Sequence, residues 1–222
     1  AVVCDGLGGL SLGEVASGNV ILAFDKWFKE QFMAPGAEWT GESIRNSWED
    51  IIYSMNQKIK EYGASQGVEM GTTITAVLFL KDKYYAIHVG DSRLYELSDG
   101  CRQITEDQTL IARELAQGII TKEQALTDSR RNVLLQCIGV TQKLLPAFYS
   151  GNINGEAAYL VCSDGFRHVI TPDEIYQLCR PLQNLTQKVM QVNLTSLVER
   201  VKQRGERDNI SAVLIQVGRA TC

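Results

Sequence analysis

The first third of the chain carries a hydrophobic pattern with the 3.6-residue period of α-helices. A short apolar run at 2–4 precedes a stretch, 14–32, in which apolar residues recur every three or four positions until a Pro-Gly pair at 35–36. A second helical stretch follows, and Thr40 or Ser43 can cap it. Its apolar face consists of Ile44, Trp48, Ile51, Ile52, Met55, Ile59 and Tyr62. The pattern therefore predicts a short strand and two amphipathic helices that pack on a sheet.

The period changes to that of β-strands from residue 72. Apolar and β-branched runs are separated by short turns, of which Asp99-Gly100 is a strong hairpin signal. Because short turns join antiparallel neighbours, we expect these runs to pair in an antiparallel sheet. The predicted strands are 72–80, 84–89, 94–97 and 102–104.

Shorter elements make up the rest of the chain. Residues 107–140 are typical of short helices, Pro172 marks the first turn of another helix, and a longer helical pattern covers 185–203. Because strands and helices occur in separate runs and do not alternate strictly, the predicted fold class is α+β, with helices covering β-sheet. The remaining predicted strands are 147–150, 158–162 and 210–217.

Composition narrows the function classes. The chain has 222 residues, 45% of them hydrophobic, which is enough for the core of a single domain, 1–222. A formal net charge of −4 argues against nucleic acid or an anionic membrane as the main partner, and no apolar run approaches the roughly 20 residues of a membrane helix. The six cysteines form no C-x-x-C pair, which predicts reduced thiols and a cytoplasmic location.

Four aspartates occupy the same kind of place, the edge of an apolar strand: Asp5, Asp91, Asp164 and Asp208. If these strand ends converge, the carboxylates converge too, and they repel one another unless cations neutralise them. Hard oxygen ligands of this kind suit Mg²⁺ or Mn²⁺. A glycine directly after two of them, at positions 6 and 165, lets backbone approach a metal closely. The alternative is that each aspartate only caps a turn.

The chain resembles a known enzyme family through an ordered set of segments. These are VVCDGLGG, MGTTITAVLFL, IHVGDSRLYELSDG, ITEDQTL, YLVCSDG and ERDNISAVLIQV. Together they resemble the bacterial PPM-type, or type 2C, metal-dependent serine/threonine protein phosphatases, and the resemblance spans essentially the whole chain. It implies a four-layer αββα sandwich of two antiparallel sheets flanked by helices.

The resemblance also implies a reaction and a set of ligands. Asp5 would bridge two catalytic Mn²⁺ or Mg²⁺ ions, the Gly6 carbonyl would bind the second, and Asp164 and Asp208 would hold the first. Asp91 and Asp164 would hold the third ion found in bacterial members. A metal-activated water would then hydrolyse phosphoserine or phosphothreonine in proteins, with no covalent intermediate.

Residues outside this set have weaker assignments. The segment 112–138 matches the flap subdomain of bacterial members, where Arg130 and Arg131 are candidates for contact with a phosphopeptide; the alternative is a solvated, charged helix start. His88 is interpreted as a buried structural histidine in preference to a catalytic one, and His168 as exposed. Arg93 is a candidate for pairing with a carboxylate, with a structural role favoured for it, and Glu106 and Asp107 are expected to cap a helix.

The beginning of the sequence differs from the family pattern. Family members carry strands upstream of the first Asp-Gly pair, with an arginine that binds phosphate and acidic residues that support the second metal. We therefore expect the natural protein to extend beyond Ala1 by about one or two hairpins, without which the sandwich lacks inner N-terminal strands.

Two other functions compete with the enzyme. One is a phosphatase-like regulatory module that binds phosphoprotein without turnover. The other is a calcium-binding domain, which predicts ligands clustered in one loop, whereas these aspartates are scattered along the chain. The favoured interpretation is a monomeric cytoplasmic phosphatase whose partners are phosphorylated proteins, the products of a serine/threonine kinase.

Overall fold

The computed structural model describes residues 1–7, 12–153, 155–181 and 186–218, and it places two sheets face to face. The first sheet has the order β1-β2-β3-β6 and is antiparallel throughout. Its centre is a hairpin in which Thr75 lies opposite His88. The strands are β1 (Val2–Val3), β2 (Ile74–Leu80), β3 (Lys83–Val89) and β6 (Ala147–Asn152).

The second sheet has the order β5-β4-β7-β8 and is also antiparallel. Buried side chains of both sheets meet between them, and the rings of Phe79 and Tyr159 lie 4.8 Å apart at this contact. The strands are β4 (Arg93–Leu97), β5 (Cys101–Gln103), β7 (Ala157–Cys162) and β8 (Ala212–Val217).

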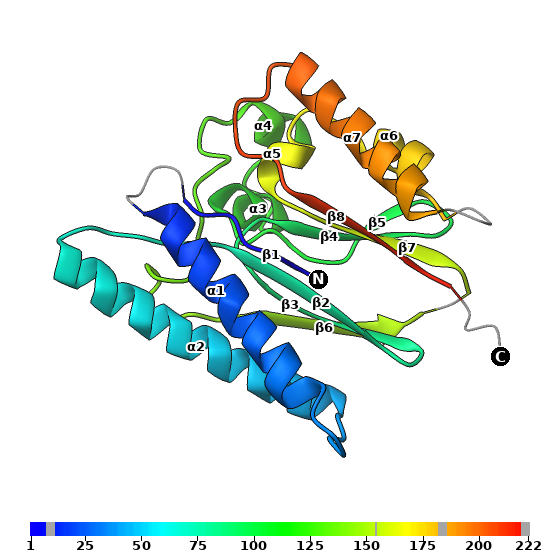
Figure 1. Cartoon of the computed structure of the whole chain (residues 1–222). Helices are drawn as coiled ribbons and strands as arrows, with labels where there is room; N and C mark the ends of the chain where they lie inside the picture. Colours follow the sequence, from blue (N-terminus) through cyan, green and yellow to red (C-terminus); the bar gives the residue numbers. More distant parts are fainter. Residues whose placement is uncertain (8–11, 154, 182–185, 219–222) are drawn as a thin grey trace.

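Helices cover the two outer faces, so the layers run helix, sheet, sheet, helix (Figure 1). The helices α1 (Gly13–Trp27) and α2 (Gly41–Gln66) lie on the first sheet, and α6 (Pro172–Cys179) and α7 (Gln187–Gln203) lie on the second. Thr40 caps α2 by accepting a hydrogen bond from Ser43 N–H, and the Ser43 side chain accepts one in return from Thr40 N–H. The predicted α+β class and the sandwich of antiparallel sheets are confirmed.

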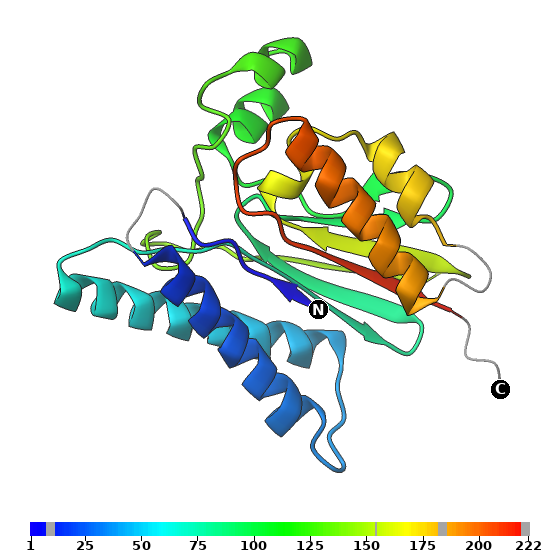
Figure 2. The same ribbon diagram turned by 45° about the horizontal axis from the view of Figure 1, so that its top comes forward.

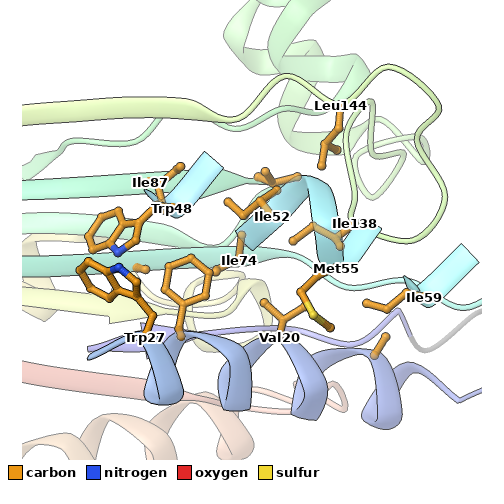
Figure 3. Close-up of a cluster of buried hydrophobic side chains, with 14 of the residues drawn as sticks. Val20, Trp27, Trp48, Ile52, Met55, Ile59, Ile74, Ile87, Ile138 and Leu144 are labelled. Atoms are coloured by element: carbon orange, nitrogen blue, oxygen red, sulfur yellow. The ribbon is translucent and has the colours of Figure 1, made fainter. Parts of the chain in front are cut away.

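Aromatic and branched side chains fill the space between α1, α2 and the first sheet (Figure 3). Trp27 and Trp48 pack edge to face with centroids 5.6 Å apart, and Val20 and Ile52 are fully buried beside them. The helix predicted over 14–32 is present in two parts, because α1 passes into a π-helical turn, η1 (Phe28–Phe32). The predicted apolar faces of both helices are therefore the faces that form this core.

A small helical lobe projects from one end of the sandwich (Figure 2). It contains α3 (Leu110–Ala116) and α4 (Lys122–Thr127), as expected for short helices over 107–140. A bridge between Thr109 and Leu134 joins the two ends of the lobe to each other, and a bridge between Thr72 and Ile138 joins its second end to the residues before β2. Its equivalence to a flap over 112–138, the single-domain organisation and the expected N-terminal strands stay predictions.

None of the helices described is both long and apolar enough to cross a membrane.

Candidate functional site

Strand ends bring the four predicted aspartates to one end of the sandwich. Asp5 follows β1, Asp91 follows β3, Asp164 begins the short helix α5 (Asp164–Arg167) after β7, and Asp208 lies just before β8. Backbone contacts fix the first of them, since Asp5 N–H donates to Thr73 Oγ1 at 3.1 Å and Thr73 N–H donates to the Asp5 carbonyl at 2.9 Å. Asp5 is therefore held by hydrogen bonds to the residue that precedes β2.

The carboxylates lie close enough to perturb one another. Burial raises the pKa of Asp5 to about 8, together with the carboxyl of Asp164 within hydrogen-bonding reach and the charges of Asp208 and Asp91. Burial also raises the pKa of Asp91 to about 6, with Arg167 opposing and Asp164 reinforcing the effect. The structure thus brings all four predicted residues together, and a proton or a cation must relieve their repulsion.

The donor set suits a hard cation. The converging groups are carboxylate oxygens, with the backbone carbonyl of Gly6 directly after Asp5. In the described part of the chain, no group of three or more His, Cys, Asp or Glu side chains closes around one point to hold a single ion. The arrangement is therefore a loose cluster in which cations would be shared between carboxylates.

Two glycines allow the backbone to approach closely beside these aspartates. A Cβ atom on Gly6 would lie 2.4 Å from the carbonyl carbon and oxygen of Gly13, at the start of α1. A Cβ atom on Gly165 would lie 2.5 Å from the Asn209 carbonyl oxygen and 3.1 Å from Asp208 Cβ. Gly165 therefore lets the Asp164 turn pack directly against the loop that carries Asp208.

Gly165→Ala is expected to lower the free energy of unfolding by about 1–3 kcal/mol, because the new methyl group overlaps backbone that has no room to move. Chemical denaturation measures this loss. Gly100→Ala is the matched control, because a Cβ atom there meets nothing within 4 Å. Equal stability of the two variants would contradict the close packing of the Asp164 turn on the Asp208 loop.

Two arginines and a further aspartate lie beside the cluster. Arg93 binds Asp107 through two hydrogen bonds of 2.8 and 2.7 Å. Arg167 Nη2 donates to the Asp91 carbonyl at 3.0 Å and lies 3.3 Å from Asp107 Oδ2. Burial alone would raise the pKa of Asp107, but the hydrogen bonds from Arg93 and the charge of Arg167 outweigh it and lower that pKa.

These contacts confirm one prediction and correct another. Arg93 pairs with a carboxylate as expected. Asp107 does not cap a helix, because the N-cap of α3 is Thr109, whose side chain accepts a hydrogen bond from Ala112 N–H. The Asp107 carboxylate instead provides the counter-charge for the partly buried guanidinium groups of Arg93 and Arg167.

A histidine connects Asp164 to Glu206, in the loop that carries Asp208. His168 Nε2 lies 3.4 Å from Asp164 Oδ2, and Nδ1 lies 3.2 Å from Glu206 Oε2. The other oxygen of Glu206 accepts hydrogen bonds from the N–H groups of Arg207 and Asp208. The expectation that His168 is exposed is wrong, since its side chain is only 12% exposed. The Arg-Asp-Asn turn before β8 is thereby tied to Asp164.

His88 is enclosed in the first sheet. It is fully buried, its Nδ1 lies 2.9 Å from Thr75 Oγ1, and its Nε2 has no hydrogen-bond partner among the described residues. Burial lowers its pKa to about 4, so the imidazole is neutral near neutral pH. This placement favours the structural interpretation, because a side chain without exposure touches no substrate.

The two arginines proposed from the sequence for peptide contact, Arg130 and Arg131, face different surroundings. Arg130 binds Glu114 and Asp128 through four side-chain hydrogen bonds of 2.7–3.1 Å. Arg131 is exposed and lines a pocket between the helical lobe and α5. Only Arg131 therefore presents its charge to a space that a ligand can enter.

Comparison with known proteins gives consistent matches. The family model described as "Protein phosphatase 2C" matches residues 1–202. A curated relative from Listeria innocua, "Serine/threonine phosphatase stp", is 30% identical over 218 residues, covering 97% of this chain and 83% of the relative. "Serine/threonine protein phosphatase PstP" from Mycobacterium tuberculosis is 28% identical and is matched over 40% of its length.

Solved structures agree with the sequence matches. The serine/threonine phosphatase Stp1 from Staphylococcus aureus superposes with a TM-score of 0.85 at 25% identity, covering 97% of this chain and 82% of that one. The catalytic domain of PstP in complex with two manganese ions superposes with a TM-score of 0.78 at 27% identity, covering 97% and 86% of the two chains.

Proposed function

The chain belongs to the protein phosphatase 2C family, as a bacterial PPM-type protein serine/threonine phosphatase, and from this premise we propose a metal-dependent mechanism for it. The reaction is hydrolysis of phosphoserine and phosphothreonine in proteins, without a covalent intermediate. The observation that carries the proposal is the convergence of Asp5, Asp91, Asp164 and Asp208, which raises the pKa of Asp5 to about 8.

Each aspartate has a role in holding cations. Asp5 would hold two ions, with Asp164 and Asp208 also holding the first and the Gly6 carbonyl the second, and Asp91 with Asp164 would hold a third. The two-manganese structure of PstP supports Mn²⁺ as one such ion, and oxygen ligands suit Mg²⁺ equally. When bound, the ions supply a water activated at neutral pH and neutralise charge on the phosphoryl oxygens.

Contacts within the chain orient this centre, and the burial of His88 excludes it as a proton donor. Glu206 and His168 hold Asp164 and the Asp208 loop in one arrangement. Such supporting contacts keep ligands fixed while charge develops in the reaction. His88 donates no proton to the leaving group, because it is buried and neutral.

We also propose a biological setting for this activity. The substrates are phosphorylated proteins produced by a serine/threonine kinase, and the phosphatase acts as a monomer in the cytoplasm. No role in binding nucleic acid or membranes is proposed for a chain with a net charge of −4.

Hydrolysis of a phosphothreonine peptide tests the function directly. Phosphate release is measured with Mn²⁺, with Mg²⁺ and with excess chelator. Turnover that requires a divalent ion supports the enzyme, whereas peptide binding and metal binding without turnover would support a regulatory module in its place. Turnover that survives complete removal of metal would overturn the proposed mechanism.

The carboxylate cluster also predicts how stability depends on pH and metal. Because the pKa of Asp5 rises from 3.8 to about 8 on folding, the folded state retains a proton that the unfolded state loses. The stabilisation that this proton gives the folded state is complete below about pH 4 and is lost as the pH rises toward 8. The increase in Tm caused by Mn²⁺ should therefore be larger at pH 8 than at pH 6, because the ion replaces the proton.

Thermal unfolding with Mn²⁺ or with chelator at both pH values measures this difference. Asp5→Asn is the informative variant, because an amide cannot titrate and the pH dependence of the metal-free protein between pH 6 and 8 should shrink. An equal Mn²⁺ effect at both pH values would contradict the coupling between the carboxylates.

A further inference from the structure

An open pocket of about 780 Å³ lies between the helical lobe and the elements that follow Asp164. One wall comes from α3, α4 and the residues after them, and the other from residues 167–172 at the end of α5 and the start of α6. In Figure 2 the lobe rises directly above α5, so the pocket opens beside the carboxylate end of the sandwich. It is large enough for a side chain of a bound peptide and several of its neighbours.

The pocket reaches the aspartate cluster through two of its lining residues. Arg167 binds the carbonyl of Asp91 at 3.0 Å, and His168 Nε2 lies 3.4 Å from Asp164 Oδ2. A peptide whose phosphorylated residue sits at the aspartates would therefore extend a neighbouring side chain into this space.

The charge of the lining is unbalanced. Four of the residues that line the pocket are basic and one is acidic, although the chain as a whole carries a net charge of −4. The single acid, Asp107, is already bound by Arg93 and Arg167 on the floor. On the lobe side, Lys122 and Arg131 form no ion pair with any residue in the described ranges. The positive charge that no salt bridge neutralises thus lies on the lobe wall of the pocket, where Glu123, next to Lys122, is the nearest acid in the sequence.

Apolar side chains surround these two cations. Leu115 and Leu126 line the lobe wall, and Ile170 lines the opposite one, so the pocket offers apolar contact to the methylene groups of a long side chain. Such a combination suits the side chain of glutamate better than that of lysine, which would meet like charge.

We propose that this pocket selects substrates by binding an acidic side chain next to the phosphorylated residue, through Lys122 and Arg131. The inference rests on the proposed function, since it assigns the peptide sequence that the same site prefers. A carboxylate and a second phosphate share the chemistry that these cations recognise. Arg130, which is bound to Glu114 and Asp128, takes no part.

The test compares phosphothreonine peptides that differ only at the flanking positions. Glutamate, glutamine, lysine or a second phosphoserine flanks the phosphothreonine, and kcat/KM is measured with Mn²⁺ at low and high ionic strength. We expect the glutamate peptide to exceed the glutamine peptide by about fivefold or more at low ionic strength, with the difference shrinking as salt rises.

Two matched double variants test whether Lys122 and Arg131 cause the preference for the glutamate peptide. Lys122→Gln/Arg131→Gln removes both pocket cations and should bring the glutamate-to-glutamine ratio close to one. Lys58→Gln/Lys188→Gln removes the same charge from exposed positions on α2 and α7, outside the pocket, and should keep the wild-type ratio. A structural defect of the lobe would lower kcat/KM for all peptides together and leave the ratio unchanged, which would overturn the assignment.

A binding measurement separates this inference from the proposed function. Fluorescence anisotropy with labelled glutamate and glutamine peptides, in chelator, reports selective binding whether or not turnover occurs. Selective binding that depends on Lys122 and Arg131, together with no hydrolysis of the same peptides when Mn²⁺ is supplied, would support the pocket and contradict the enzyme mechanism. Equal binding and equal turnover of both peptides would overturn the pocket and leave the enzyme intact, and preference for the second phosphate alone would replace the carboxylate as its ligand.

Discussion

Asp164→Asn is expected to lower kcat/KM for a phosphothreonine peptide by about a thousandfold or more. Asparagine keeps the shape of the side chain but removes the charge. Asp164 has several partners in the cluster, since it lies within reach of Asp5, contacts His168 and accepts a hydrogen bond from Gly165 N–H at 2.6 Å. A neutral group at this position leaves the proposed ions with too little charge to hold them.

Stability separates loss of function from loss of fold in this variant. Because the substitution removes a carboxylate that repels Asp5, metal-free Asp164→Asn should be at least as stable as the wild type. The Mn²⁺-induced increase in Tm should be much smaller. Asp99→Asn, in the exposed β4-β5 turn, is the control and should keep both activity and the Mn²⁺ effect. Wild-type turnover by Asp164→Asn with Mn²⁺ would remove Asp164 from the mechanism.

The four aspartates of the site were predictable from the sequence, because all four share one local pattern. An aspartate at the edge of an apolar strand occurs four times, and antiparallel pairing brings those strand ends to one end of the sandwich. The hydrophobic period similarly predicted the helix faces, because α1 and α2 bury the residues that recur every three or four positions. Both predictions rest on patterns formed by residues that are close together in the sequence.

The supporting contacts were not predictable, because they join residues far apart in sequence. His168 and Glu206 are 38 positions apart, and Arg167 and Asp91 are 76 apart. Nothing in the local sequence distinguishes Glu206 from an exposed acid, or Asp107 from a helix cap. Their roles follow only from the packing of α5 against the end of β3 and the loop before β8. A basic residue directly after Asp-Gly-Phe, beside a predicted metal ligand, was a signal in the sequence, since a charge there needs partners.

Trp48→Ala is expected to lower the free energy of unfolding by about 3–5 kcal/mol, the range for deleting a large aromatic side chain from a core. Trp48 is 2% exposed and packs against Phe24, Trp27 and Phe148, with centroids 5.8, 5.6 and 6.4 Å away. The cavity cannot collapse easily, because α1, α2 and the first sheet all contribute to its walls (Figure 3). Denaturant unfolding measures the loss.

Two further variants show what kind of interaction Trp48 provides. Trp48→Phe should cost much less than Trp48→Ala, because Trp48 Nε1 is buried without a hydrogen-bond partner in the described structure and its removal recovers that penalty. Tyr53→Ala, at a 44% exposed position on the same helix, should change stability by at most about 1 kcal/mol. Since this helix layer lies on the outer face of the first sheet, kcat/KM of the folded Trp48→Ala protein should equal that of the wild type. A large fall in kcat/KM well below its Tm would mean that the α1-α2 layer positions the aspartates and does not merely stabilise the sheet that carries them.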